Sequence, residues 1–307
     1  MGSYVRPTTF IRSMELNRIL GIDVVIASET FQETGSFKFR AAWNLVTNVP
    51  HPDIIAASSG NFGQALARAC QIVGKGCTVV MPQSSARVKV EAVLGYGAYV
   101  ELIDTAFISR AAKVEELQQA NPSAYVASAY DDAWVIQGNA TLGDEIARMD
   151  PLPEIVVAPI GGGGLVSGLI QGLKRASCKI EVVGAEPALA NDAARSLRAG
   201  EIVRNDSEPM TLADGARTVS VGVQNWEILK EGIADIVEVS EDSLCQSLRM
   251  LFRVANLKVE PTGALSVGAL LTDPERFRNR RVCCVVSGGN VDADLYARLI
   301  TNQSPVG

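Results

Sequence analysis

The chain is poor in the residues on which many catalytic sites depend, above all histidine. Its 307 residues include one histidine, His51, which lies between two prolines in a setting typical of a rigid, solvated loop. Hydrolases of the Ser-His-Asp type, HExxH metalloproteases and centres with three histidine ligands all depend on histidines that this sequence lacks. If the protein is an enzyme, we expect another group to move protons.

Paired cysteines, long apolar runs and clusters of positive charge are also missing. The six cysteines show no CxxC spacing and lie mostly in apolar contexts, which favours buried thiols over disulfides or a zinc site. No apolar run approaches the ~20 residues of a membrane-spanning helix, and residues 1–9 lack the plan of a signal peptide, so we expect a cytoplasmic protein without membrane contact. The net charge of −6, without a basic run, argues against nucleic-acid binding.

What the sequence does contain is a regular alternation of apolar strands and amphipathic helices. Its length and its 47% hydrophobic composition allow two domains or one large α/β unit. The alternation is typical of α/β folds with largely parallel sheets. The predicted strands are 24–27, 54–57, 78–81, 99–103, 125–127, 155–160, 180–185, 236–239 and 282–286. The clearest predicted helices are 62–73, 87–94, 111–119, 141–149, 165–174, 243–254 and 263–271.

The first candidate for chemistry is a lysine between two phenylalanines. Lys38 precedes a helical-looking run, and either Thr34 or Ser36 is a good N-cap for that helix. Lys38 is then expected in the first turn, where the helix macrodipole disfavours a cation. A desolvated amine in this position has a lowered pKa, the condition for a nucleophilic lysine that forms Schiff bases. The alternative is a lysine whose ammonium group reaches water.

Three further candidates are polar, glycine-containing loops, each following a predicted strand. Residues 58–63 open a helix and suit a carboxylate or phosphate, and Ser59 is a possible proton donor over a short reach. Residues 161–164 are four consecutive glycines, which predict a phosphate-binding nest. Ser287 begins the third loop, and ligands of such sheets gather at the carboxyl ends of strands, so we expect the loops to converge there. In the plainer interpretation these polar residues only cap helices and form turns.

A dinucleotide-binding oxidoreductase is the competing interpretation of the glycine run. Glu186 ends the next strand about 20 residues later, where a ribose-binding acid would stand. However, Val166 or Ser167 occupies the position of the third glycine in the dinucleotide fingerprint, and no Walker lysine follows. The spacing therefore favours a phosphate nest over a nicotinamide site.

Together, and in this order along the chain, the four segments resemble the fold-type II pyridoxal-phosphate enzymes, most closely the serine racemases and the serine/threonine dehydratases. The resemblance implies a tryptophan synthase β-like α/β fold with two open, twisted, mostly parallel sheets covered by helices. It implies a small mobile domain, residues 53–129, inserted into a large cofactor-binding domain of residues 1–52 and 130–307. A homodimer is also expected.

The same resemblance implies roles for individual residues. Lys38 would hold pyridoxal 5′-phosphate as a Schiff base and remove the α-proton of the substrate, and Ser59 would protonate the opposite face in a racemase. The other cofactor contacts would be Phe37 and Gly215 beside the ring, Asn61 at the ring hydroxyl, Ser287 at the pyridine nitrogen, and Gly161, Gly162, Gly163 and Gly164 at the phosphate. The amino-acid substrate would contact Ser58, Ser59, Gly60, Asn61, Phe62 and Arg110.

A divalent-cation site is implied by residues 186–192, which resemble that of the serine racemase group. The carboxylates of Glu186 and Asp192 and the carbonyl of Ala190 would bind Mg²⁺, Mn²⁺ or Ca²⁺. The alternative is a strand-end glutamate and a helix-capping aspartate. Two positions depart from the family pattern: Phe62 stands where a histidine is common, favouring a less polar β-substituent, and Arg217 could bind a second substrate carboxylate.

The expected activity is that of an ammonia-lyase, which converts serine, threonine or a 3-hydroxy analogue to a 2-keto acid and ammonia by α,β-elimination. A neutral hydroxyl at Ser287, where a carboxylate would protonate the pyridine nitrogen, weakens the electron sink and favours elimination over transamination. Amino-acid racemisation with the same cofactor and residues is the nearest alternative, and a nicotinamide-dependent oxidoreductase is more remote. The presence of both Lys38 and Ser59 argues against an inactive homologue.

Overall fold

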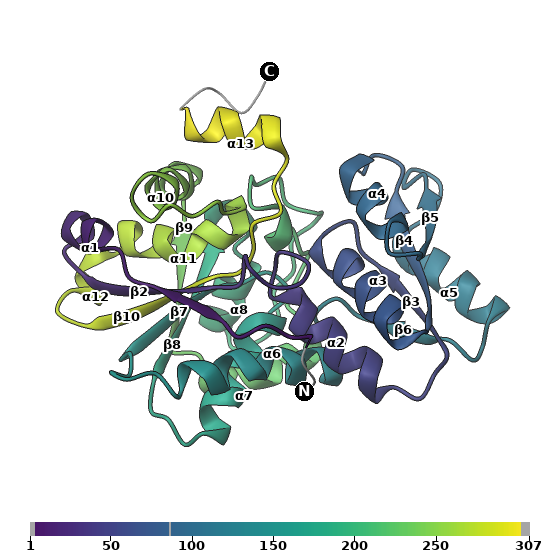
Figure 1. The fold of residues 1–307 in the computed structure, drawn as a ribbon, viewed down its shortest axis with the longest axis horizontal. Helices are drawn as coiled ribbons and strands as arrows, with labels where there is room; N and C mark the ends of the chain where they lie inside the picture. Colours follow the sequence, from purple (N-terminus) through teal and green to yellow (C-terminus); the bar gives the residue numbers. More distant parts are fainter. Residues whose placement is uncertain (1–3, 86, 302–307) are drawn as a thin grey trace.

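The protein is built on two β-sheets of unequal size, in a computed structural model that describes residues 4–85 and 87–301. The larger sheet has the strand order β1-β2-β10-β7-β8-β9, and the smaller has the order β5-β4-β3-β6. Figure 1 shows the larger sheet on the left and the smaller on the right, with helix α2 between them. The strands pair in parallel except for β1, which runs antiparallel to β2. This is the α/β architecture expected from the sequence.

The nine predicted strands are all present, each within two residues of its predicted ends. The larger sheet contains β1 (Thr9–Ile11), β2 (Asp23–Ser28), β7 (Ile155–Pro159), β8 (Glu181–Pro187), β9 (Asp235–Val239) and β10 (Arg281–Val286). The smaller sheet contains β3 (Asp53–Ala57), β4 (Gly76–Pro82), β5 (Tyr99–Ile103) and β6 (Tyr125–Ala127). The sequence did not reveal β1, because this short edge strand has no buried residue to give it an apolar pattern.

The helices that surround the sheets are α1 (Met14–Leu20), α2 (Lys38–Asn48), α3 (Asn61–Val73), α4 (Arg87–Leu94), α5 (Arg110–Ala120), α6 (Ala133–Ile146), α7 (Gly164–Arg175), α8 (Asp192–Ala199), α9 (Val223–Gly232), α10 (Glu241–Val254), α11 (Pro261–Thr272), α12 (Pro274–Phe277) and α13 (Ala293–Ile300). Two 3-10 turns are η1 (Ala188–Ala190) and η2 (Asp214–Ala216). In the part of the chain that the structure describes, no helix is both long and apolar enough to cross a membrane.

The predicted helix 141–149 is wrong at both ends, because α6 begins eight residues earlier and ends at Ile146. The early half of α6 contains Gly138, a residue that disfavours helices in isolation. Here Gly138 allows close packing: a Cβ on it would lie 2.7 Å from the Cα of Ala41 in α2. Tertiary packing of α6 on α2 therefore outweighs the local helix propensity.

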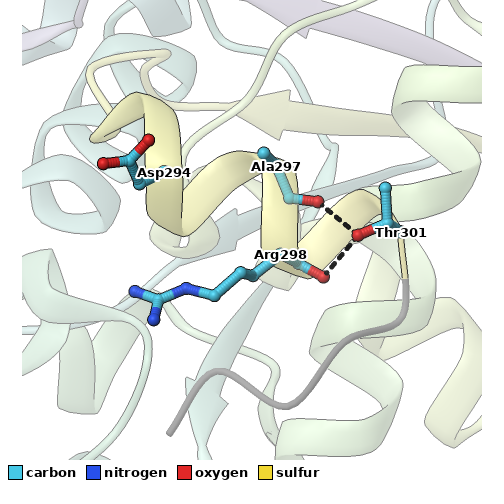
Figure 2. Close-up of a pocket in the computed structure, with 4 residues that line it drawn as sticks. All are labelled: Asp294, Ala297, Arg298 and Thr301. Atoms are coloured by element: carbon cyan, nitrogen blue, oxygen red, sulfur yellow. Dashed lines mark hydrogen bonds between the residues drawn. The ribbon is translucent and has the colours of Figure 1, made fainter. Parts of the chain in front are cut away.

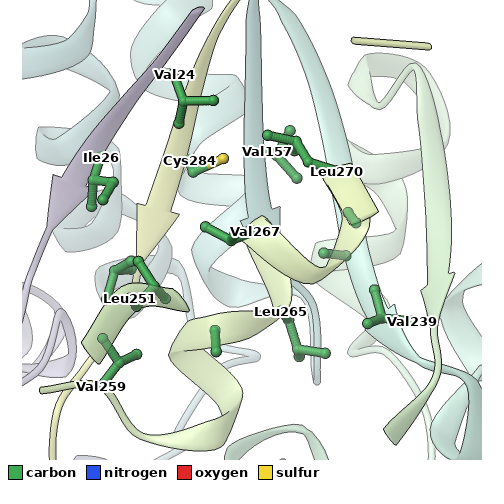
Figure 3. Packing of buried hydrophobic residues seen from close by; sticks show 14 of the residues in the cluster. Val24, Ile26, Val157, Val239, Leu251, Val259, Leu265, Val267, Leu270 and Cys284 are labelled. Atoms are coloured by element: carbon green, nitrogen blue, oxygen red, sulfur yellow. The ribbon is translucent and has the colours of Figure 1, made fainter. Parts of the chain in front are cut away.

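Two apolar cores cover the two faces of the larger sheet. In one core, Val24, Val157 and Cys284 from the sheet pack against Val267 and Leu270 of α11 (Figure 3). The other core packs α6 and α7 against the opposite face and includes Cys283. Successive residues of a strand point to opposite faces, so these two adjacent cysteines lie in different cores. The six cysteines are all free thiols, as expected.

The sheet topology brings two of the candidate loops to one edge. β10 pairs in parallel with both β2 and β7, so the loops that follow β7 and β10 leave the larger sheet on the same side. The smaller sheet takes all four of its strands from residues 53–127. The loop after β3 leads into α3, whose first residue, Asn61, contacts Glu260 and Asn290 of the larger part. The candidate site lies where these loops meet.

Candidate active site

A short backbone ladder ties the start of α2 to the loop after β10. Ser36 and Gly288 form an antiparallel bridge. The N–H of Phe37 donates to the carbonyl of Ser287 at 2.9 Å. These main-chain contacts fix the backbone directly before Lys38, so two segments from opposite ends of the sequence form one structural unit.

Because of this ladder, α2 begins later in the chain than the sequence predicts. α2 begins at Lys38, with Phe37 at the N-cap position and no side chain that caps it. The N-cap predicted at Thr34 or Ser36 is therefore wrong, because the backbone is still engaged in the ladder at residues 36 and 37. Lys38 nevertheless lies in the first turn, as expected, where the helix dipole opposes its positive charge.

Lys38 is a half-buried residue whose amine lies between two aromatic rings. Its Nζ lies 4.9 Å from the centroid of Phe37 and 5.8 Å from that of Phe62, and it donates to the carbonyl of Ala129 at 2.6 Å. Burial lowers the pKa of Lys38 to about 8, although the carboxylate of Glu260 acts in the opposite direction. A useful fraction of the amine is then unprotonated near neutral pH, as a nucleophilic lysine requires.

Asn61, the first residue of α3, is part of a chain of side-chain hydrogen bonds that joins the two sheets. Its Nδ2 donates to both carboxylate oxygens of Glu260, at 2.9 and 3.0 Å. Its Oδ1 accepts from Nδ2 of Asn290 at 2.8 Å. Sequence analysis missed Glu260; the one local signal is its place directly before Pro261, which begins α11.

The four glycines at 161–164 join β7 to α7 in a tightly enclosed turn. Gly163 has a φ of +93°, the left-handed region that favours glycine. A Cβ on Gly162 would collide with the ring of Tyr130, and one on Gly163 would lie 2.9 Å from the Cβ of Asn225. Larger residues do not fit here, so the loop can approach a ligand with its backbone.

The N–H groups of this loop are available to a ligand. None of the hydrogen bonds within residues 4–85 and 87–301 uses the N–H of Gly161, Gly162 or Gly163 as donor. A row of free N–H groups at the N-terminus of a helix suits an anion such as a phosphate. Gly215 lies beside the loop, since a Cβ on Gly161 would lie 3.0 Å from its carbonyl oxygen.

The serines of the site differ in how their hydroxyl groups are used. The hydroxyl of Ser287 is buried and has no hydrogen-bond partner among the described residues. Ser58 accepts from the N–H groups of Gly60 at 3.3 Å and Gly63 at 3.0 Å, which is the plainer, turn-forming behaviour. Ser59 is half-buried in the same loop and takes part in no hydrogen bond within the described residues. Of these three serines, Ser59 and Ser287 have hydroxyl groups that are not engaged by the described residues.

The arginines considered from the sequence both have protein partners. Arg110 begins α5 and forms an ion pair with Glu208 at 2.8 Å. Arg217 donates through Nε to the carbonyl of Thr211 at 2.8 Å. Nearby, Lys89 of α4 pairs with Asp214 at 2.6 Å, so two ion pairs link helices of the smaller sheet to the segment 208–214.

Glu186 and Asp192 form a buried acidic pair at the end of β8. The oxygens of Glu186 accept from the N–H groups of Ala193 and Ala194 at 2.9 Å, so this carboxylate caps α8. Oδ2 of Asp192 is buried without a partner in the described chain. Burial, reinforced by Asp192, raises the pKa of Glu186 well above its ordinary value, and burial raises that of Asp192 to about 6. Residues 4–85 and 87–301 contain no cluster of three or more His, Cys, Asp or Glu suited to a metal.

Two surface hollows lie away from this site. One, of about 480 Å³, is lined by Asp294, Ala297, Arg298 and Thr301 of the α13 region (Figure 2). Another, of about 620 Å³, is lined by Pro7, Thr8, Phe10, Arg12, Val25, Glu145, Arg148, Met149 and Asp150. Neither is lined by a site residue expected from the sequence.

Comparison with known proteins yields one family and several close relatives. A family model described as "Pyridoxal-phosphate dependent enzyme" matches residues 2–288. The chain is 34% identical to an L-threo-3-hydroxyaspartate ammonia-lyase of Pseudomonas sp, over 98% of this chain and 95% of that protein. It is 33% identical to a serine racemase of Schizosaccharomyces pombe, over 97% and 93%. Among solved structures, maize serine racemase superposes with a TM-score of 0.91 at 28% identity, over 97% of this chain and 93% of that one.

Proposed function

The chain belongs to the family of pyridoxal-phosphate dependent enzymes, and from this premise we propose that it is an ammonia-lyase. In this proposal it converts a β-hydroxy amino acid to a 2-keto acid and ammonia by α,β-elimination. The names of similar proteins support the reaction class: besides the hydroxyaspartate enzyme, an L-threonine ammonia-lyase of Thermotoga maritima is 32% identical over 98% of this chain and 75% of that protein. The observation that carries the proposal is the amine of the half-buried Lys38 beside the converging loops.

The residues of the site fit pyridoxal phosphate, the cofactor of the family. The free N–H groups of Gly161, Gly162 and Gly163 suit its phosphate, and the unpartnered hydroxyl of Ser287 suits its pyridine nitrogen. Lys38 supplies the amine that holds it covalently. When bound, the cofactor withdraws electrons from the α-carbon of the amino acid.

In this proposal the protein moves the α-proton of the substrate and adds no negative charge beside the pyridine ring of the cofactor. With the cofactor bound, Nζ of Lys38 would be the group that accepts the α-proton of the substrate, and burial lowers the pKa of this amine to about 8 in the structure. The hydroxyl of Ser287, buried without a partner in the described residues, would hold the pyridine nitrogen with a neutral hydrogen bond and would supply no negative charge to it, which would favour loss of the β-hydroxyl over transamination.

Racemisation is the second candidate activity, and Ser59 is the observation that favours it. Its half-buried hydroxyl is free of protein hydrogen bonds in the described residues, whereas that of Ser58 is occupied. In this proposal Ser59 gives a proton to the α-carbon from the face opposite Lys38. Solved structures named serine racemase are among those that superpose on this chain.

We also propose a divalent cation at Glu186, Asp192 and the carbonyl of Ala190. The support is the buried acidic pair, whose mutual repulsion a cation would relieve, and the unpartnered Oδ2 of Asp192. Chelation with EDTA is expected to lower the melting temperature of the wild type but not that of Asp192→Asn. An unchanged melting temperature in the wild type would count against the site.

The domain division and the homodimer remain proposals. The support for a small domain of residues 53–129 is that the smaller sheet is built entirely from this segment. The ion pairs of Lys89 and Arg110 join it to the rest of the site through side chains, which a hinge motion can break and re-form. Sedimentation of the purified protein would establish the oligomeric state.

The first experiment is a visible absorption spectrum of the purified protein, followed by keto-acid release from a panel of amino acids. The panel contains L- and D-serine, L-threonine, 3-hydroxyaspartate and phenylserine. A yellow band that borohydride bleaches, with the label recovered on Lys38, is expected, and the panel then identifies the substrate. A protein that stays colourless with added pyridoxal phosphate would overturn the proposal and favour a nicotinamide-dependent reaction.

A further inference from the structure

Glu260 is a buried carboxylate to which the proposed reaction gives no role. It lies directly before α11 and is only 4% exposed. Its N–H donates to the carbonyl of Gly288 at 3.1 Å, and a Cβ on Gly288 would lie 2.6 Å from its Oε1. The carboxylate thus packs against the loop after β10. A carboxylate buried to this extent is costly unless its oxygens accept hydrogen bonds.

Asn61 supplies those hydrogen bonds, and it is in turn held by Asn290. Nδ2 of Asn61 donates to both oxygens of Glu260, while its Oδ1 accepts from Nδ2 of Asn290. Nδ2 of Asn290 also donates to the carbonyl of Thr34 at 2.7 Å. The orientation of the Asn61 amide is thereby fixed, because a flip would place its oxygen against the carboxylate and its NH₂ group against that of Asn290.

We propose that Glu260 is a positioning residue of the active site, which fixes the amide of Asn61 and supplies a buried negative charge beside it. The assignment rests on the proposed function and on the contact with the ring hydroxyl of the cofactor that the family resemblance implies for Asn61. The carboxylate then acts on the chemistry through two other residues. Because Nδ2 of Asn61 is engaged by both carboxylate oxygens, Oδ1 is the amide atom left to accept a hydrogen bond from the ring hydroxyl, and the charge of Glu260 favours the ammonium form of Lys38.

Burial and nearby charges bring the pKa of the Glu260 carboxyl group close to neutral pH. Burial and the nearby carboxylate of Asp214 raise the pKa of Glu260 to about 7, while the hydrogen bond from Asn61 and the charge of Lys89 act in the opposite direction. Above this pH the carboxylate accepts both hydrogen bonds from Asn61. As the pH falls through 7, one oxygen gains a proton and opposes the NH₂ group, and the charge that favours the ammonium form of Lys38 is lost.

The first test uses the full-length protein after removal of its cofactor, so that its outcome does not depend on the proposed activity. The rate at which acetic anhydride labels Lys38 is measured by peptide mass spectrometry from pH 6 to 10. Glu260→Gln removes the charge, so the pKa of Lys38 is expected to fall and labelling at pH 7 to rise about threefold or more. Glu260→Asp keeps the charge and is expected to restore a rate close to that of the wild type.

Asp132→Asn is the matched control. Asp132 is 6% exposed and occupies the residue before α6, as Glu260 does before α11. Its substitution is expected to lower the melting temperature and to leave labelling of Lys38 unchanged. Equal labelling in the wild type and Glu260→Gln, or the same increase in Asp132→Asn, would overturn the assignment.

The second test uses the holoenzyme. Glu260→Gln is expected to move the pH midpoint of the cofactor absorption by about half a unit or more and to lower kcat about tenfold, with KM within about threefold. A lower kcat with an unchanged absorption midpoint and unchanged labelling would show a purely structural contribution and reject the assignment. If the wild type binds no cofactor, the proposed function fails, and the labelling experiment still decides whether Glu260 controls Lys38.

Discussion

The two halves of the site are joined to the rest of the molecule in different ways. On the side of the larger sheet, main-chain hydrogen bonds fix Lys38 through the ladder of Ser36 and Phe37 with the loop after β10. On the side of the smaller sheet, contacts to the other half run through side chains, notably Asn61 with Glu260 and the partly exposed pair of Lys89 with Asp214. Exposed ion pairs contribute at most about 1 kcal/mol each. The side of Lys38 is therefore held by main-chain contacts, and the side of Asn61 by side-chain contacts that can re-form more easily.

The largest effect is expected from removing the amine on the fixed side. Lys38→Ala is predicted to lower kcat about 10³-fold or more, because in the proposed mechanism this amine both holds the cofactor and accepts the α-proton. Borohydride should then fix no cofactor to the chain. Lys174→Ala, at an exposed position in α7, serves as the control and should leave both properties unchanged. Substantial activity in Lys38→Ala would contradict the mechanism.

A smaller effect is expected from filling the glycine loop on the same side. Gly162→Ala places a Cβ against the ring of Tyr130, and overpacking of this kind costs about 1–3 kcal/mol. We expect about tenfold weaker binding of pyridoxal phosphate, measured by fluorescence titration. Gly200→Ala is the control: its φ of +76° makes alanine unfavourable, but a Cβ there meets nothing within 4 Å. It should lower stability only, and equal cofactor affinities in the two variants would argue against the nest.

Ser59→Ala tests the adjustable side and separates the two candidate activities. Loss of the opposite-face proton donor is predicted to lower racemisation about tenfold or more, while elimination from the L-substrate stays within about threefold. Chiral chromatography and keto-acid release on the same sample measure both rates. Equal losses would show that Ser59 binds the substrate without delivering a proton.

The smallest effect is expected at the ion pair that joins the two sides. Lys89→Gln removes the partner of Asp214 and is predicted to lower kcat/KM about threefold at low salt, an effect that should shrink as salt screens the pair. Arg87→Gln is the control, because Arg87 pairs with Glu91 within α4 and its side chain is 91% exposed. If both variants behave alike, the contact between the two sides does not influence turnover.

The elements that the sequence revealed are those whose pattern is local. β3, β7 and β10 each follow from a short apolar run that ends in a polar, glycine-containing loop. The four glycines at 161–164 are equally local, because only the absence of a Cβ permits so close a turn. The beginning of α6 was not predictable in this way, since Gly138 is tolerated there only because α2 lies against it.

Within the site, sequence analysis identified the residues that stand in recognisable motifs. It missed Glu260, which belongs to no motif that we recognised. Lys38 and Ser287 stand in recognisable segments, whereas Glu260 lies in an unremarkable stretch before a proline. Its importance appears only through Asn61, a hydrogen-bond partner 199 residues away in the sequence. No local pattern encodes a pair at that separation.

By itself the sequence determined the family and the alternation of strands and helices, and it singled out the four segments to which we assign the chemistry. Only the tertiary structure decided the pKa values and the hydrogen-bond partners of the side chains within these segments. The pKa of Lys38 depends on how completely the folded chain excludes water from its amine, and the charge that opposes this effect comes from Glu260, on a distant segment. Burial and electrostatic interactions depend on which groups lie close together in the folded protein. Groups far apart in the sequence become neighbours only when the chain folds, so these pKa shifts cannot be read from a local sequence pattern.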